Sequence, residues 1–316
     1  MRKLLLCGLL ALPLPAAASC GAAFCSVNTS WDVQGAWQEP GARFDLRYEY
    51  VNQDRPMSGS RRVPFGRLTR HHDEIETRNR NLLASVDYTI NADWGLNAML
   101  PIVHRGHAHI HNHRGTPFLE TWNFTEVGDA RIVARRRLGG AEDARPSAST
   151  WGGMFGLKLP TGRRDHANPS GQVAERSLQP GTGTTDALIG AYYARQFPAH
   201  GWSWFAQPML QLPLNMREEY RPGRRVSLDT GVRYQATDAL GLMLQLNALH
   251  RGRDRGANAE RPDTGGNSLF LSPGASYAIT PGWQVYGFLQ LPLYQYVNGV
   301  QIVAGRAVAV GVSAKF

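Results

Sequence analysis

Apolar and polar residues alternate along much of the chain with a period of two. The C-terminal segment shows this most clearly, because small or polar residues separate its apolar positions, which are Val308, Val310, Val312, Ala314 and Phe316. A period of two is that of a β-strand with one apolar face. We therefore expect the chain to end in a half-apolar strand with an aromatic last residue.

An early segment, residues 43–50, alternates apolar side chains with ions. Its apolar positions are Phe44, Leu46, Tyr48 and Tyr50, and its charged positions are Arg43, Asp45, Arg47 and Glu49. A transmembrane β-barrel turns alternate residues toward lipid and toward a polar lumen, whereas buried strands of soluble proteins rarely carry so many ions. The pattern predicts the wall of a transmembrane barrel.

The same alternation predicts about twelve strands, and hence an all-β, antiparallel transmembrane barrel. The expected strands are 43–50, 81–90, 95–104, 128–138, 151–160, 185–196, 202–214, 225–236, 241–251, 268–279, 283–296 and 302–316. Short turns rich in Gly, Pro, Asn and Asp alternate with longer segments, predicted to be extracellular loops: 54–80, 105–127, 161–184, 215–224 and 252–267. Trp94, Trp202 and Trp283 begin outgoing strands, as in an interfacial aromatic girdle.

The N-terminus has the three regions of a secretory signal peptide: a basic start, an apolar run and small residues. We predict a signal peptide over 1–19, a periplasmic segment or lumen plug over 20–41, and a barrel over 42–316 in the bacterial outer membrane. In an oxidising compartment Cys20 and Cys25 could form a disulfide, and lipidation of Cys20 is the alternative.

The chain carries a formal charge of +9, but its arginines are scattered rather than gathered on one element. A nucleic-acid partner is therefore not expected; outer-membrane lipid and a small-molecule solute are, and the oligomeric state is not predicted. From the alternation of lipid-facing and lumen-facing positions we predict that seven charged side chains point into the lumen: Arg43, Arg47, Arg131, Arg135, Arg233, Asp45 and Glu49. They could favour anionic solutes, or pair with one another to fill a narrow barrel.

Five histidines crowd a ten-residue stretch: His104, His107, His109, His111 and His113. Alternate residues of an extended segment point the same way, so several imidazoles could bind Zn, Cu or Ni, and His71, His72, Asp73 and Glu74 of the preceding loop could add ligands. The other interpretation is a water-facing, pH-sensitive loop tip. Apart from this possible divalent metal, no cofactor is expected.

Motifs of catalysis are missing from the sequence. It has no G-x-S-x-G elbow, no phosphate-cradling loop and no H-E-x-x-H helix. We therefore expect a protein that is not an enzyme.

Three motifs lie in the middle of the chain: Gly128-Asp129, the G-x-K-x-P-T-G run of residues 156–162, and the G-x-G-x-x-D run of residues 181–186. Together they resemble the outer-membrane protein family of the meta-pathway of phenol degradation. The resemblance implies a barrel that passes small apolar or aromatic solutes, with structural rather than substrate-binding motifs: glycines in turns, and Asp186 bonded to a loop. The alternatives are a metal-binding or metal-export accessory barrel and a structural or adhesive barrel.

Overall fold

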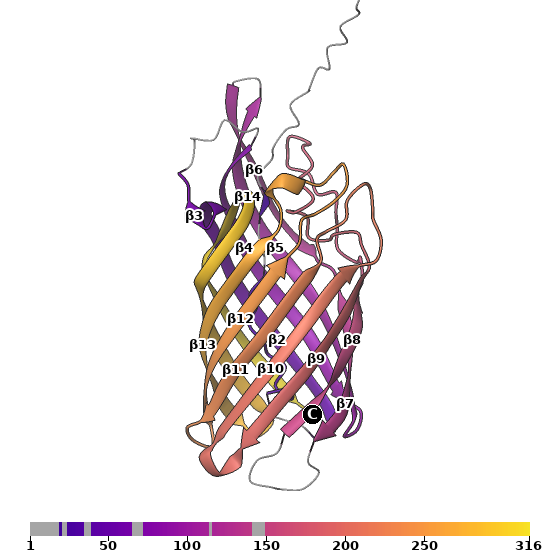
Figure 1. Ribbon diagram of the computed structural model, residues 1–316, viewed down its shortest axis with the longest axis vertical. Helices are drawn as coiled ribbons and strands as arrows, with labels where there is room; N and C mark the ends of the chain where they lie inside the picture. Colours follow the sequence, from indigo (N-terminus) through magenta and orange to yellow (C-terminus); the bar gives the residue numbers. More distant parts are fainter. Residues whose placement is uncertain (1–18, 21–23, 35–38, 65–71, 114–115, 141–148) are drawn as a thin grey trace, which may run out of the picture.

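The computed structural model describes residues 19–20, 24–34, 39–64, 72–113, 116–140 and 149–316, which form a closed antiparallel β-barrel (Figure 1). Almost all of the expected signal peptide, residues 1–19, lies outside the described residues. Within the described part, no helix is both long enough and apolar enough to cross a membrane.

Eleven strands of the described chain form the wall: β2 (Gly41–Gly59), β4 (His72–Thr89), β5 (Trp94–His113), β7 (Arg131–Gly140), β8 (Ser149–Lys158), β9 (Asp186–Phe197), β10 (Trp202–Pro213), β11 (Arg225–Gln235), β12 (Leu240–Arg251), β13 (Gly266–Thr280) and β14 (Trp283–Lys315). The first half of β14 pairs with β13, and its second half pairs with β2 and closes the barrel. The chain reverses near Gly299, which has a φ of 59°. The described chain thus crosses the wall twelve times, as the alternation predicted.

The remaining elements lie off the wall. Two short strands, β1 (Ser19–Cys20) and β3 (Arg61–Arg62), pair with β14 and β2, and two 3-10 turns are η1 (Pro198–His200) and η2 (Arg261–Asp263). Strand β6 (Thr116–Val127) pairs with the upper half of β5, whereas β7 pairs with its lower half. The β5–β6 hairpin therefore stands above the barrel wall (Figure 1).

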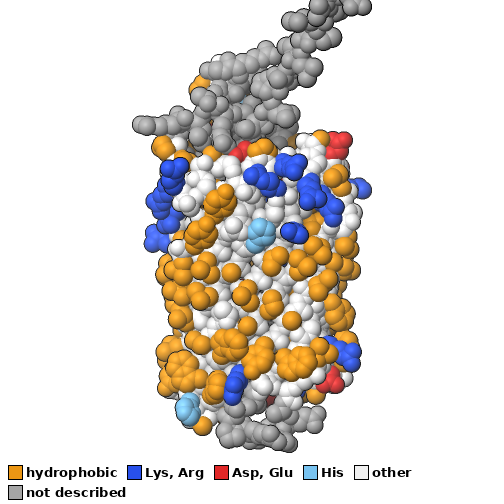
Figure 2. Space-filling model, in the orientation of Figure 1, with side chains coloured by type: hydrophobic (Ala, Val, Ile, Leu, Met, Phe, Trp, Pro, Cys, Tyr) orange, Lys and Arg blue, Asp and Glu red, His pale blue; other side chains and the backbone are white. Residues whose placement is uncertain are grey.

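The outer surface of the wall is apolar. Phe44 and Tyr48 are 39% and 40% exposed, whereas Glu49, on the opposite face of β2, is fully buried. Hydrophobic side chains cover the middle and the turn end of the barrel, and Lys and Arg gather mainly near the loop end (Figure 2). Exposed Trp202 and Trp283 begin β10 and β14 at the turn end, in the position expected of an aromatic girdle. The barrel therefore presents a lipid-facing belt, as the outer membrane requires.

Two of the five predicted loops are wrong. Residues 54–80 hold the extended end of β2 and the start of β4, and residues 105–127 hold most of the β5–β6 hairpin. These extensions rise beyond the lipid belt, so neither face has to be apolar and the alternation that marks the wall is lost. The other three, 161–184, 215–224 and 252–267, connect wall strands as expected.

Residues 24–34 lie inside the barrel. The backbone N–H of Asn28 donates to Gln245 Oε1 at 2.9 Å, and Trp31 Nε1 donates to Ser313 Oγ at 3.0 Å. Trp31 also packs edge-on against Tyr286, with ring centroids 5.0 Å apart. We call this described part of the segment, residues 24–34, the plug.

Candidate functional site

A cavity of about 330 Å³ lies between the plug and the wall. Apolar side chains on its border include Trp31, Leu83, Met154 and Leu188, and polar groups such as Arg131 interrupt them. Ligand pockets in proteins have volumes of about 300–1,000 Å³, and this cavity falls within that range.

The predicted lumen charges at the turn end bind the plug. Arg43 lies 3.5 Å from Asp32 of the plug and 3.5 Å from Asp87 of β4. Arg135 of β7 is a second partner of Asp32. No pattern in the sequence marked Asp32 as a partner, because the plug lacks the alternation that assigns side chains to a face. One plug carboxylate thus joins two arginines from different strands.

Farther up the lumen, Arg47 pairs with Glu49 at 3.0 Å, and Glu49 also accepts the backbone N–H of Cys25 at 3.2 Å. Asp45 accepts hydrogen bonds from Tyr286 Oη at 2.9 Å and from Ser313 Oγ at 2.6 Å. These groups satisfy one another and the plug backbone. The arrangement is that of the second interpretation, in which charges fill a narrow barrel.

Two more predicted arginines have neutral partners. Arg131 donates to Gln211 Oε1 at 3.4 Å beside the cavity. The guanidinium of Arg233 lies 6.0 Å from the ring centre of Trp31 and donates to Gln235 Oε1 at 3.1 Å. A cation over an indole face is attracted by the ring quadrupole, so Arg233 helps to hold the plug. Anion selectivity stays a prediction.

The expected disulfide is wrong, because Cys25 is a buried free thiol. Its Sγ lies 3.8 Å from the carbonyl oxygen of Val308, whereas Cys20 pairs through its backbone with Ile302. Ile302 and Val308 are six residues apart on β14, which corresponds to about 20 Å along an extended strand. A disulfide needs Cα atoms within about 7 Å of each other.

The three motif segments converge at the loop end, in what we call the lysine cluster: Asp129, Lys158 and Asp186. Lys158 Nζ lies 2.8 Å from Asp129 Oδ2 and 3.3 Å from Asp186 Oδ1, and all three residues are buried. The backbone N–H of Thr182 donates to Asp129 Oδ2 at 2.9 Å, and Thr184 Oγ donates to Asp186 Oδ1 at 2.7 Å. Asp186 thus bonds to a loop, as expected of a structural motif.

Motif glycines let this loop, residues 159–185, fold back on itself. A Cβ on Gly162 would lie 2.7 Å from Gly181 Cα, closer than packed atoms approach. The N–H of Gly162 donates to Asp129 Oδ1 at 3.1 Å, and Gly183 has a φ of +74°, which favours glycine. The loop is therefore fastened to the lysine cluster at both of its ends.

The histidine stretch is an ordered strand, so the interpretation as a water-facing loop tip is wrong for its centre. His107 and His109 are only 3% and 1% exposed and lie on the inner face of β5, beside the buried Glu74 of β4. We call Glu74, His107 and His109 the histidine cluster. Pairing of β5 with both β4 and β6 buries these imidazoles, and no periodicity in the sequence indicated that hairpin.

The other histidines of the stretch are placed differently. His111 Nδ1 lies 3.3 Å from Glu120 Oε2 of β6, a residue that the sequence did not single out. His104 turns to the opposite face, where its Nδ1 lies 2.8 Å from Thr125 Oγ. The side chain of His113 is outside the described part of the structure.

Comparison with known proteins places the chain in a family. Residues 85–302 match the model of a family described as "Putative MetA-pathway of phenol degradation". No curated protein matches the sequence. An outer membrane channel from Pseudomonas putida F1 has the same fold, with a TM-score of 0.67 and 14% identity over 92% of this chain and all of that one.

Two further solved barrels are more distant. The NanC porin has a TM-score of 0.43 and 13% identity over 86% of this chain and all of that one. The P. putida toluene transporter TodX has a TM-score of 0.41 and 10% identity over 87% of this chain and 90% of that one. Because the family model spans more than two thirds of the residues, this outer-membrane barrel belongs to the phenol-degradation family.

Proposed function

We propose that this protein is a non-enzymatic channel that carries small apolar solutes, such as phenol-like aromatic compounds, across the outer membrane. The observation that carries the proposal is the cavity of about 330 Å³ enclosed between the plug and the wall. An apolar cavity of about 150 Å³ holds benzene, so one aromatic ring fits this space.

The cavity border mixes apolar side chains with neutral polar and charged ones, including Arg47, Arg131 and Arg225, which suits a ring that carries a polar substituent. Leu83, Met154 and Leu188 offer apolar contacts, and Gln211 and Ser227 offer hydrogen-bonding groups. The plug and the ion pairs that hold it occupy part of the lumen, which disfavours bulk flow of water and ions. The description of the family and the channel from P. putida F1 point in the same direction.

The test compares substitutions at two adjacent residues of β11, one that faces the cavity and one that faces lipid. Ser227 of β11 borders the cavity, and its neighbour Leu228 is 43% exposed on the lipid side. We expect Ser227→Phe to slow the uptake of micromolar radiolabelled phenol by cells that depend on this channel. Leu228→Phe adds the same ring outside and should leave uptake unchanged.

Single-channel recording in planar bilayers separates this proposal from a wide pore. The wild-type barrel should pass little ionic current, and a variant lacking residues 24–34 should pass a steady one. Equal phenol uptake with and without the protein would contradict the proposal and favour a structural or adhesive barrel.

A further inference from the structure

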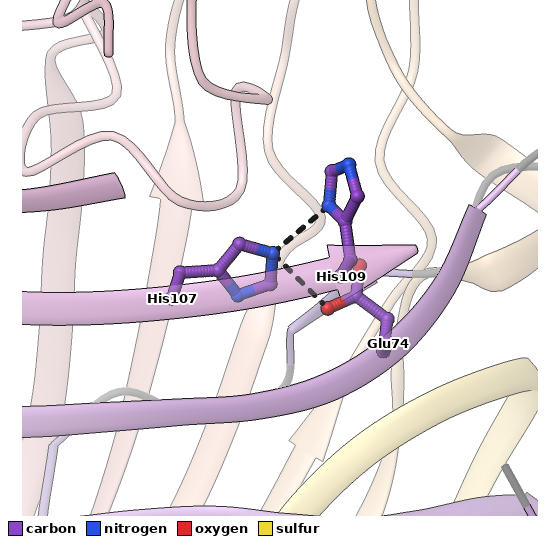
Figure 3. Close-up of side chains that lie close together, drawn as sticks. All are labelled: Glu74, His107 and His109. Carbon is purple, nitrogen blue, oxygen red and sulfur yellow. Dashed lines mark hydrogen bonds and ion pairs between the residues drawn. The ribbon is translucent and has the colours of Figure 1, made fainter. Parts of the chain in front are cut away.

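The histidine cluster gathers three metal-ligand side chains on one inner face of the mouth (Figure 3). Glu74 and His109 stand directly opposite each other in the register of β4 and β5. His107 lies two residues before His109 on the same strand, and hence on the same face. The backbone pairing, rather than flexible side chains, brings the three groups together.

The donor atoms of the cluster are spaced as around one ion. His107 Nε2 lies 3.0 Å from His109 Nδ1 and 3.4 Å from Glu74 Oε2, and the three donors all lie within 4.8 Å of one another. A tetrahedral ion with bonds of about 2.0–2.1 Å separates its donors by about 3.3–3.4 Å. The two separations from His107 are therefore within a few tenths of an ångström of those around one ion, and the donors of Glu74 and His109 lie no more than 4.8 Å apart.

The second nitrogen of each imidazole is already held by another residue. Thr77 Oγ lies 2.7 Å from His107 Nδ1, and Glu120 Oε2 lies 2.8 Å from His109 Nε2. Metal-binding histidines usually engage such an outer partner, often a carboxylate, which fixes the ring and raises its basicity. Both rings thus turn their remaining nitrogen into the cluster.

The surroundings of the cluster are rigid and shielded from water. The indole of Trp122 lies against both imidazoles, with ring centroids 5.7 Å from His107 and 5.0 Å from His109. Trp122 Nε1 donates to the carbonyl oxygen of Gln172 at 3.0 Å, and the Gln172 side chain binds Glu120. Glu120, the outer partner of His109, and the Trp122 indole are therefore both fastened to the loop of residues 159–185.

We propose that Glu74 Oε2, His107 Nε2 and His109 Nδ1 bind one divalent cation of the Zn, Co or Ni class at the mouth of the barrel. Two imidazoles and one carboxylate suit these borderline ions, whereas Ca²⁺ and Mg²⁺ prefer oxygen donors alone. His111 and Glu120 form a second potential set with His109. In the site that we propose, Glu120 instead holds His109 Nε2 at 2.8 Å as an outer partner.

The experiment uses the full refolded barrel without an oligohistidine tag, stripped of metal with a chelator and titrated with Co²⁺ or Zn²⁺. We expect one equivalent per chain and the visible absorption of Co²⁺ bound to nitrogen and oxygen. Glu74→Gln and His107→Gln should weaken binding by more than about 100-fold, because even an outer partner is worth about 10–100-fold. Thr77→Val should weaken it by about 10-fold.

The matched control is His104→Gln, which removes a histidine of the same strand from the opposite face. It should keep the affinity and stoichiometry of the wild type. Heat-dependent gel mobility identifies variants that have folded. If the variants fail to fold, X-ray absorption of the wild-type zinc form decides, and two imidazoles with one carboxylate are expected.

Two outcomes would overturn the proposal. One is a wild-type barrel that retains no metal, or whose zinc spectrum shows water oxygens without paired imidazoles. The other is unchanged affinity in folded Glu74→Gln and His107→Gln. In either case the cluster would be a hydrogen-bonded network that serves only to order the hairpin.

Discussion

The lysine cluster and the histidine cluster are two buried polar groups at the same end of one barrel, and they differ in the source of the positive charge that balances their carboxylates. In the first, Lys158 places a covalently attached cation between Asp129 and Asp186. In the second, Glu74 meets two imidazoles whose nitrogens are also metal donors. Burying an ion is costly unless it is paired. The chain itself supplies the cation in one case, and we infer that the solvent supplies it in the other.

The largest effect should come from Lys158→Met. Removing the cation leaves Asp129 and Asp186 buried and facing each other, which should lower the free energy of unfolding by about 3–5 kcal/mol. Urea titration of the refolded barrel measures the change. The control is Lys315→Met at the partly exposed pair with Glu39, which should cost less than about 1 kcal/mol. Similar losses of unfolding free energy in the two variants would show that the buried lysine cluster stabilises the barrel no more than an exposed ion pair does.

A smaller effect should follow from adding zinc. At a concentration 100-fold above Kd, a ligand that binds only the folded state adds about 2.7 kcal/mol to the free energy of unfolding. We expect this increment in the wild type and in Lys158→Met, but not in His107→Gln. A zinc increment that vanished in Lys158→Met would mean that the two clusters are one coupled unit.

Adding a single methyl group to the loop that supports the lysine cluster should lower the stability of the barrel. Gly181→Ala drives a Cβ into the backbone of Gly162, and overpacking of this kind costs about 1–3 kcal/mol. Gly153→Ala is the control, because a Cβ there meets nothing within 4 Å. Denaturant midpoints compare the two. Equal midpoints would show that the loop relaxes at no cost.

The smallest effect on stability should come from an exposed ion pair between the loops of residues 159–185 and 215–224. The hydrogen bond from Arg164 at 2.8 Å, aided by Arg176, lowers the pKa of Glu218 from its usual value of 4.5. A lowered folded pKa contributes stability that is present above pH 4.5 and is lost as the pH falls through the lowered pKa. The wild type should therefore lose more stability than Glu218→Gln below about pH 4.5 in acid titrations. High salt should remove the difference, and a salt-independent difference would contradict a surface origin.

The wall could be predicted from the sequence because lipid imposes an apolar residue at each outward position, as at Phe44 and Tyr48. The β5–β6 hairpin could not, because it stands beyond the lipid and its outward positions include Gly106 and Ala108. Without an apolar face, a strand above the membrane resembles a loop in its sequence.

The histidine cluster could be predicted only in part. The spacing of His107 and His109 placed them on one face, but the position of Glu74 depends on the register of β4 and β5, which contains a shift between Glu74 and Glu76. Glu120 enters through a hairpin that the sequence did not indicate. Contacts set by strand register are properties of the closed sheet rather than of any one segment.

The hydrogen bond from Trp31 to Ser313 joins residues 282 positions apart. It lies beside the β2–β14 seam, the pairing of most distant strands in the wall. Contacts of such separation form late in folding, because the entropy of closing a long loop has to be met first. The plug contacts both strands of this seam, through Trp31 to β14 and through Cys25 to β2. We therefore expect segment 24–34 to enter the lumen as the seam closes, so that a newly assembled barrel passes through no stage with an open lumen.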